Sequence, residues 1–240
     1  MNLDTAHVLV VGAGLMGAGI AQVAAQAGHE VALFDTRDGA AEAAKAKLAA
    51  TLEGLVAKGK LSAEAVAATL ARIKPVAALQ PADLVIEAIV EHLDVKRALF
   101  AELEALLSDE AVIATNTSSI SVTALARGMQ RPERLVGMHF FNPVPLMKLV
   151  EVVSGLGTAP EVAQAVFDLA ARWGKTPVHA RSTPGFIVNR IARPYYAEAL
   201  LLLQDRVAKP EVIDACLRAA GFRMGPCELM DLIGHDTNFA

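Results

Sequence analysis

A glycine-rich turn near the N-terminus constrains the fold more than any other feature of the sequence. Gly12, Gly14 and Gly17 form a GxGxxG pattern. Residues 7–11 before the turn are mostly apolar and β-branched, which predicts a strand covered on both faces. Residues 15–27 after it carry apolar side chains at helical spacing. The turn therefore predicts a strand that leads directly into a helix, as an α/β fold begins.

The same region lacks charge. No Asp, Glu, Lys or Arg lies between Asp4 and Glu30, and a membrane helix needs about 20 apolar residues. The glycines and the change from strand to helical pattern argue against a membrane helix. A secretory signal would need a basic segment before its apolar run, and only Asp4 is charged there. We expect neither a membrane segment nor a signal peptide.

Apolar β-branched runs and amphipathic runs alternate along the rest of the chain. Further strands are predicted at 30–35, 83–89, 111–115, 134–140, 148–153 and 176–180. Helices are predicted at 38–58, 94–107 and 160–173, and another helical stretch ends before Pro75. This order predicts an open, mainly parallel α/β sheet with right-handed crossovers.

An acidic residue completes a dinucleotide-binding pattern. Asp35 ends the second strand, 18 residues after Gly17. In this arrangement the glycines let the backbone approach a pyrophosphate, and the amides of the helix N-terminus face the anion. We expect the contacts to come from the turn and its acid, namely Gly12, Gly14, Leu15, Met16, Gly17 and Asp35. A glycine turn without a cofactor is the alternative.

The acid also indicates which dinucleotide binds. A carboxylate at Asp35 would accept hydrogen bonds from the adenosine ribose and would repel a 2′-phosphate, which favours NAD over NADP. Arg37, two residues further on, is the residue that could instead receive a phosphate.

Pro184 and Gly185 mark a domain boundary, because the strand pattern stops there. We predict a Rossmann-type dinucleotide-binding domain over 1–183 and a smaller all-α domain over 184–240. The α-domain opens with a stretch, 186–204, that is apolar on nearly every face, and such a helix is buried.

The apolar helix indicates association. Pro194 is expected to kink it or to begin a new turn. A domain of about 55 residues cannot bury such a helix alone. We therefore expect it to pack on a partner and to serve dimerisation.

Composition excludes several classes of protein. The chain of 240 residues is 54% apolar and 20% charged, which is typical of a globular rather than a disordered chain. A net charge of −4 argues against a nucleic-acid partner. Cys216 and Cys227 form neither a disulfide framework nor a CxxC metal pair. We expect no metal and a reducing, cytoplasmic location.

A histidine and a glutamate lie on two consecutive predicted strands. His139 is near the end of one, Glu151 is in the middle of the next, and two prolines lie in the connection. Side chains brought together in this way would form a general base with its orienting carboxylate. A satisfied core histidine and an edge-strand glutamate are the alternatives that these residues leave open.

Six segments spread over the whole chain carry a more specific pattern. They are GAGLMGAGIA (12–21), LVIEAIVEHLDVK (84–96), TNTSSIS (115–121), GMHFFNPVPLMKLVEVV (137–153), STPGFIVNRIARPYYAEA (182–199) and MGPCELMDLIG (224–234). Together they resemble the L-3-hydroxyacyl-CoA dehydrogenase family, nearest to its 3-hydroxybutyryl- and 3-hydroxyadipyl-CoA members. ARPYYAEA (192–199) and DLIGHDTNFA (231–240) are similar to members from phenylacetate degradation.

The resemblance implies roles for single residues. His139 is similar to the base that takes the proton of the substrate 3-hydroxyl, and Glu151 to its carboxylate partner. Ser118 is similar to a serine that touches substrate and nicotinamide, and Asn189 to an asparagine that holds the acyl group. Nucleotide contacts are implied for Asp35, Glu91, Lys96, Ser118 and Asn142. Coenzyme A contacts are implied for Thr51, Lys58 and Ser118.

Some of these residues also have structural interpretations. Ser118 or Ser119 could cap a helix, and Asn189 could bridge backbone groups. Lys58 could belong to a solvated face. Lys96 could pair with an acid of its own helix, such as Glu91 or Asp94.

The reaction implied by the resemblance is NAD-dependent oxidation of an L-3-hydroxyacyl-CoA to a 3-ketoacyl-CoA. The acyl-CoA is expected in a cleft between the domains of a homodimeric enzyme. Family members continue beyond the point that matches Ala240, so the helical domain is expected to be partial and the chain truncated. The alternatives are a non-catalytic NAD-binding relative and a dehydrogenase of free hydroxy acids. Acyl chain length and preferred direction stay open.

Overall fold

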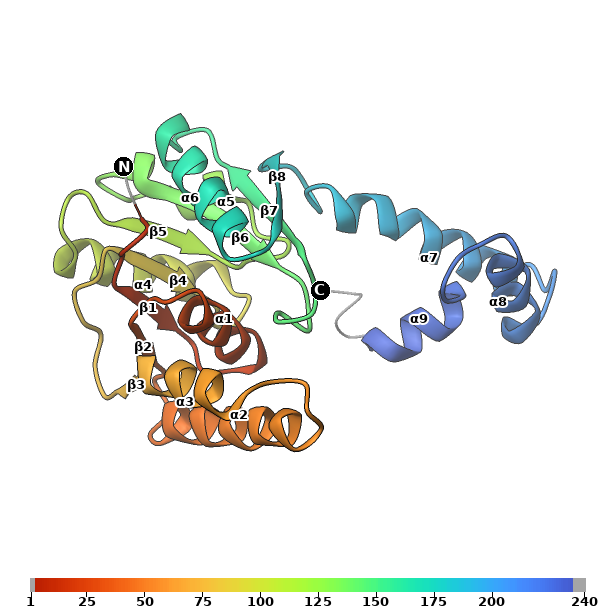
Figure 1. Ribbon diagram of the computed structural model, residues 1–240. Coiled ribbons are helices and arrows are strands. Elements are labelled where there is room, and N and C mark those ends of the chain that lie inside the picture. The colour runs from red at the N-terminus through yellow and green to blue at the C-terminus, as the bar shows by residue number, and fades with distance from the viewer. Residues whose placement is uncertain (1–2, 235–240) are drawn as a thin grey trace. The chain divides into compact units, whose positions relative to one another are not determined.

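The computed structural model describes residues 3–234, and the chain divides into two compact units, 1–183 and 184–240 (Figure 1). In the described part of the first unit, a sheet of eight strands has the order β3-β2-β1-β4-β5-β6-β7-β8. Its strands are β1 (Val8–Val11), β2 (Val31–Phe34), β3 (Ile73–Val76), β4 (Leu84–Glu87), β5 (Val112–Thr115), β6 (Leu135–Phe140), β7 (Leu149–Ser154) and β8 (Thr176–Arg181). Neighbouring strands are parallel except for β6 and β7. The predicted α/β class is confirmed.

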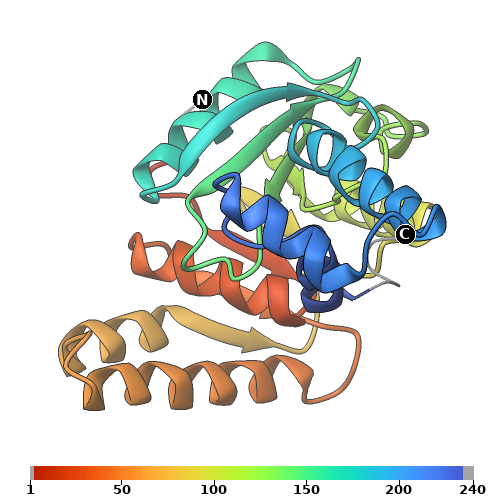
Figure 2. The same cartoon turned by 90° about the vertical axis from the view of Figure 1, so that its right-hand side faces the viewer.

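The helices of the first unit connect these strands. They are α1 (Leu15–Gln26), α2 (Ala40–Ala57), α3 (Ala63–Arg72), α4 (Leu93–Leu106), α5 (Val122–Leu125) and α6 (Pro160–Arg172), with a 3₁₀ turn at Pro132–Arg134. The helices α2 and α3 lie side by side next to β3 (Figure 2). The long helices α1, α2, α4 and α6 agree with the predicted ones to within a few residues.

One strand differs from the sequence interpretation. Pro75 was expected only to end a helical stretch, yet it lies inside β3. The strand is tolerated because β3 forms the edge of the sheet and pairs only with β2, and proline in a sheet is confined to such edges.

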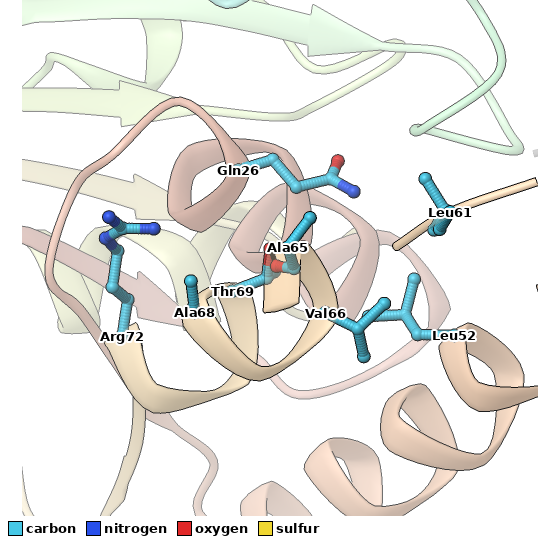
Figure 3. Close-up of a pocket in the computed structure, with 8 residues that line it drawn as sticks. All are labelled: Gln26, Leu52, Leu61, Ala65, Val66, Ala68, Thr69 and Arg72. Atoms are coloured by element: carbon cyan, nitrogen blue, oxygen red, sulfur yellow. Dashed lines mark hydrogen bonds between the residues drawn. The ribbon is translucent and has the colours of Figure 1, made fainter. Parts of the chain in front are cut away.

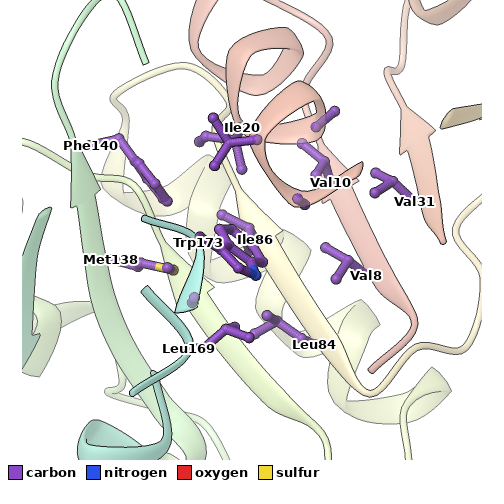
Figure 4. Packing of buried hydrophobic residues seen from close by; sticks show 14 of the residues in the cluster. Val8, Val10, Ile20, Val31, Leu84, Ile86, Met138, Phe140, Leu169 and Trp173 are labelled. Atoms are coloured by element: carbon purple, nitrogen blue, oxygen red, sulfur yellow. The ribbon is translucent and has the colours of Figure 1, made fainter. Parts of the chain in front are cut away.

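The core lies between the sheet and the helices on its faces. Val8 and Val10 of β1 pack in one cluster with Ile20 of α1 and Leu169 of α6 (Figure 4). Leu9, between them in sequence, is fully buried but lies outside this cluster. Both sides of β1 are therefore covered, as its continuous β-branched sequence predicts.

The glycine turn after β1 is closely packed. Gly12 has φ +103°, and a Cβ there would lie 2.5 Å from the carbonyl oxygen of Ala88. A Cβ at Gly17 would lie 1.7 Å from the carbonyl oxygen of Gly12. Only hydrogen fits at these two positions, so α1 can begin directly beside the ends of β1 and β4.

The charge-free stretch forms β1, the turn and α1. Within residues 3–234, no helix has both the length and the apolarity required to cross a bilayer.

The second unit consists of α7 (Val188–Gln204), α8 (Pro210–Ala219) and α9 (Pro226–Ile233) within the described residues. Its small core is formed by Ala199, Ile213 and Met230. The helix α7 continues through Pro194 as one element, so Pro194 begins no new element. Pro194 has no N–H to donate, and the remaining backbone hydrogen bonds of α7 are enough to keep the helix continuous. Of the segment DLIGHDTNFA, residues 235–240 lie outside the described part.

The apolar surface of α7 is only partly covered. Ala199 is its one buried residue, whereas Ile191 is 71% exposed and Leu200 and Leu201 are each 49% exposed. The helices α8 and α9 therefore cover only part of α7, as expected for a domain too small to bury an apolar helix alone.

The packing of the glycine turn predicts that alanine lowers the free energy of unfolding far more at Gly17 than at Gly14. Gly17→Ala should lower the free energy of unfolding by about 3 kcal/mol, because its Cβ would overlap backbone that cannot move aside. Gly14→Ala is the matched control. Gly14 has φ −70° and a Cβ there meets nothing within 4 Å, so its stability should change by less than about 0.5 kcal/mol. Urea unfolding measures the free energy of unfolding of both variants. Equal values for Gly17→Ala and Gly14→Ala would contradict the close packing of Gly17.

Candidate functional site

His139 and Glu151 face each other across the antiparallel strands β6 and β7. They are paired residues of the ladder, and His139 Nδ1 lies 2.7 Å from Glu151 Oε2. The side chains are 6% and 0% exposed. A carboxylate buried to this extent requires a hydrogen-bond partner. Donation from Nδ1 orients the imidazole and makes Nε2 its basic nitrogen, which is the arrangement of a general base.

The connection between these two strands is anchored on both sides. Asn142 lies in it, next to a cis bond to Pro143. Lys175 Nζ donates to the carbonyl oxygens of Val144 and Met147, and its partial burial lowers the pKa of Lys175. A Cβ at Gly19 of α1 would lie 2.9 Å from the Cβ of Val144. The loop that carries Asn142 is thus held against α1 in the same unit.

Glu91 organises the turn that carries Ser118. Its Oε1 accepts from Thr117 Oγ1 at 2.5 Å, from Ser118 N at 2.9 Å and from Ser119 N at 3.1 Å. Neither Ser118 nor Ser119 caps α5, since Ser121 is the N-cap. Glu91 therefore fixes the backbone around Ser118.

The ionisation of Glu91 depends on the same contacts. Burial raises the pKa of Glu91, but the hydrogen bond from Thr117 and the charge of Lys96 outweigh it and hold the pKa below its usual 4.5. Glu91 is therefore an ionised carboxylate at neutral pH.

Lys96 lies beneath this turn, and its side chain is 1% exposed. Its Nζ is 2.5 Å from Glu87 Oε1 and 3.2 Å from Glu91 Oε2. Glu91 is a partner that the sequence indicates for Lys96, whereas Glu87 is a partner that only the structure reveals. The only signal for Glu87 was a single acidic residue inside the apolar run 83–89, where an ionised side chain needs a buried partner.

Asp35 is tied to the glycine turn. Its Oδ2 accepts from Ala13 N at 2.8 Å, and its Oδ1 accepts from Arg37 N at 3.0 Å and Nε at 3.2 Å. Burial opposes ionisation, but these hydrogen bonds outweigh it and lower the pKa of Asp35. Arg37 pairs with Asp35, and most of its side chain is exposed.

The start of α1 is open to a ligand. The helix has no side-chain hydrogen bond at its N-cap, Gly14, and Leu15 is 69% exposed. Uncapped amides at a helix N-terminus, next to a glycine without steric neighbours, can hold a pyrophosphate.

The remaining predicted residues lie on other elements. Thr51, in the last two turns of α2, donates from Oγ1 to the carbonyl oxygen of Lys47 at 2.9 Å. Lys58 is the exposed C-cap residue of α2. Asn189 belongs to the second unit, in the first turn of α7. The roles of these three residues stay predictions.

Two surface hollows contain none of the predicted site residues. One, of about 320 Å³, is lined by Gln26 of α1, Leu52 of α2 and Arg72 of α3 among others (Figure 3). The other, of about 260 Å³, lies between α4 and the segment after α5. Among residues 3–234, no group of three or more His, Cys, Asp or Glu is arranged to hold a metal ion.

Two family models match consecutive parts of the chain. One is described as "3-hydroxyacyl-CoA dehydrogenase, NAD binding domain" and matches residues 7–183. The other is described as "3-hydroxyacyl-CoA dehydrogenase, C-terminal domain" and matches residues 185–240. The predicted resemblance and the predicted cofactor, NAD, are confirmed.

Related proteins and solved structures match nearly the whole of this chain. The chain is 55% identical to 3-hydroxyadipyl-CoA dehydrogenase of Escherichia coli, over 100% of this chain and 51% of the relative. A crystal structure of 3-hydroxybutyryl-CoA dehydrogenase from E. coli gives a TM-score of 0.95 at 55% identity, covering 98% of this chain and 51% of that one. For (S)-3-hydroxybutyryl-CoA dehydrogenase from Ralstonia eutropha the TM-score is 0.94 at 41% identity, with 97% and 84% covered. The chain thus spans about half the length of the E. coli proteins.

The contacts of Glu91 predict a pH-dependent contribution to stability. Glu91→Gln should lower the free energy of unfolding by about 2 kcal/mol at neutral pH, because hydrogen bonds to a charged acceptor are lost. The folded-state pKa lies below the unfolded value near 4.5, so the advantage of the wild type is complete above that value. It disappears as the pH falls through the lowered folded pKa.

Urea unfolding of both proteins from neutral to acidic pH measures this difference. Glutamine does not titrate, so the two stabilities should converge on acidification. A difference that stays constant with pH would show that the charge of Glu91 does not contribute.

Proposed function

Because the chain belongs to the 3-hydroxyacyl-CoA dehydrogenase family, we propose that it oxidises an L-3-hydroxyacyl-CoA to the corresponding 3-ketoacyl-CoA with NAD⁺. The observation that carries this proposal is the buried contact between His139 and Glu151 on adjacent strands. This contact would supply a base that takes the hydroxyl proton of the substrate. A non-catalytic NAD-binding protein would not need such a base.

The reaction transfers a hydride and a proton from the same substrate. The nicotinamide of bound NAD⁺ supplies the acceptor for the hydride from C3. Nε2 of His139 takes the proton of the 3-hydroxyl as the C3–O bond becomes a carbonyl. Glu151, already hydrogen-bonded to Nδ1, stabilises the imidazolium that forms.

The cofactor is proposed to lie across the carboxyl ends of β1, β4 and β5. Gly12, Gly14 and Gly17, with Leu15 and Met16, would hold the pyrophosphate at the start of α1. Asp35 would accept from the ribose hydroxyls. Its ionised state supports a preference for NAD over NADP, because a carboxylate repels a 2′-phosphate.

The other predicted residues complete the proposed site. Ser118 would contact both the nicotinamide and the substrate, and Asn189 would hold the acyl group. Glu91, Lys96 and Asn142 would contact the nucleotide, although Lys96 is buried beneath the turn rather than exposed on it. Thr51 and Lys58 would contact coenzyme A.

We propose a short acyl chain for the substrate, because the similar proteins are named for 3-hydroxybutyryl-CoA and 3-hydroxyadipyl-CoA. These two acyl groups differ in length and charge, so the choice between them stays open. The proposed location is the cytoplasm, which is supported by two unpaired cysteines, Cys216 and Cys227.

Replacement of the base should reduce turnover with little effect on folding. His139→Gln should lower kcat for NADH formation from 3-hydroxybutyryl-CoA by about 10²–10⁴-fold, the usual range for general-base catalysis. His179→Gln is the matched control, because His179 lies exposed on β8 and stacks on Phe167. Equal rates for His139→Gln and wild type would refute the assigned base.

The exposed surface of α7 predicts a homodimer. Leu201→Glu should convert dimers to monomers in sedimentation velocity, because it buries a charge at an apolar interface. Leu156→Glu is the control, since Leu156 is 92% exposed in a loop of the first unit. A wild-type chain that sediments as a monomer would contradict the proposed dimer.

A further inference from the structure

We propose that Glu87 is a positioning residue that holds Glu91 and the Ser118 turn in place for the cofactor, acting through Lys96 and Thr115. This inference rests on the proposed function, in which Glu91 and Ser118 contact NAD. Glu87 itself would touch neither cofactor nor substrate.

Glu87 occupies a central position in the sheet. It is the last residue of β4 and pairs in register with Val11 of β1 and with Thr115 of β5. The glycine turn begins directly after Val11, and the Ser118 turn begins shortly after Thr115. Glu87 therefore lies between the two strand ends at which the loops proposed to hold the cofactor begin.

Both carboxylate oxygens of Glu87 accept hydrogen bonds. Glu87 is 0% exposed. Its Oε1 accepts from Lys96 Nζ at 2.5 Å and from Ile89 N at 2.8 Å, and its Oε2 accepts from Thr115 Oγ1 at 2.6 Å. These donors belong to three segments, which are the loop after β4, the first turn of α4 and the end of β5. One buried anion thus joins all three.

Lys96 transmits this arrangement to the surface. Its Nζ contacts Glu87 and also Glu91 Oε2, at 3.2 Å. The other oxygen of Glu91 holds the amides of Ser118 and Ser119. An unbroken series of polar contacts therefore runs from Glu87 through Lys96 and Glu91 to the Ser118 turn.

The charge balance explains why Glu87 matters to Glu91. A single ammonium serves two carboxylates, and Glu87, the more deeply buried, is the closer. Without the charge of Glu87, the attraction of Lys96 would act on Glu91 alone. Glu91 would then be drawn toward Lys96 and away from the amides that it holds.

A purely structural role makes a different prediction. A buried ion pair can serve packing alone, and the loss of one partner then destabilises the fold. Cofactor affinity would be unaffected as long as the protein is folded. Stability and NADH affinity must therefore be measured on the same variants.

The test is Glu87→Gln in the full 240-residue chain. We expect the Kd for NADH, from the fluorescence of the bound nucleotide, to rise about tenfold, since small displacements of positioning groups are costly. Because Ser118 is proposed to contact the substrate as well, the KM for 3-hydroxybutyryl-CoA at saturating NAD⁺ should also rise. A purely structural role of Glu87 predicts instead a lower melting temperature with both constants unchanged.

Glu104→Gln is the matched control. Glu104 is a largely buried carboxylate near the other end of α4, with Arg134 at 3.8 Å and the amides of Gln130 and Arg131 as donors. Its replacement removes a comparable anion that is remote from the proposed site. The melting temperature should fall in both variants, and only Glu87→Gln should weaken NADH binding.

Two results would overturn the inference. One is a Glu87→Gln protein that is less stable but binds NADH as tightly as wild type. If that variant does not fold, Thr115→Val tests the route through Thr115, whose Oγ1 donates to Glu87 and accepts from Thr117 N at 3.3 Å in the Ser118 turn. An unchanged Kd for NADH in this variant overturns that part of the inference. A wild-type chain that does not bind NADH at all would instead refute the proposed function, and this inference with it.

Discussion

The rest of the structure depends on the close contact between the glycine turn after β1 and the end of β4. A side chain at Gly12 would collide with the backbone of Ala88, and one at Gly17 would collide with Gly12 itself. Because hydrogen atoms occupy both positions, α1 begins against the sheet with its amides exposed. Next to this contact, the order of the strands reverses direction between β1 and β4, where open α/β sheets bind ligands.

The proposed catalytic pair lies on the two strands of the sheet that run antiparallel to each other. β6 and β7 are antiparallel, so His139 and Glu151 become direct neighbours although 12 residues separate them. In a parallel pair they would be joined by a long crossover instead. The short connection is anchored by Lys175 and carries Asn142. One local change of direction thus brings the proposed base, its proposed carboxylate partner and a proposed cofactor contact together.

Much of this arrangement could be predicted from the sequence, since it depends on patterns with a clear physical cause. The β-branched run before Gly12, the amphipathic helices and the acid at Asp35 each indicate one element or contact. Two features could not be predicted. The strand at Ile73–Val76 contains Pro75, and only its edge position in the finished sheet makes that strand possible. The role of Glu87 depends on Lys96, nine residues away, whose side chain reaches it only after β4 and α4 have packed.

In the proposed reaction, a hydride moves from C3 of an acyl-CoA to NAD⁺ while His139 takes the proton. The most direct measurement uses (S)-3-hydroxybutyryl-CoA with deuterium at C3 and determines the mass of the nucleotide product. Direct transfer predicts that each NADH formed carries the deuterium and that free 3-hydroxybutyrate gives no product. NADH without the label, or turnover of the free acid alone, would contradict the account.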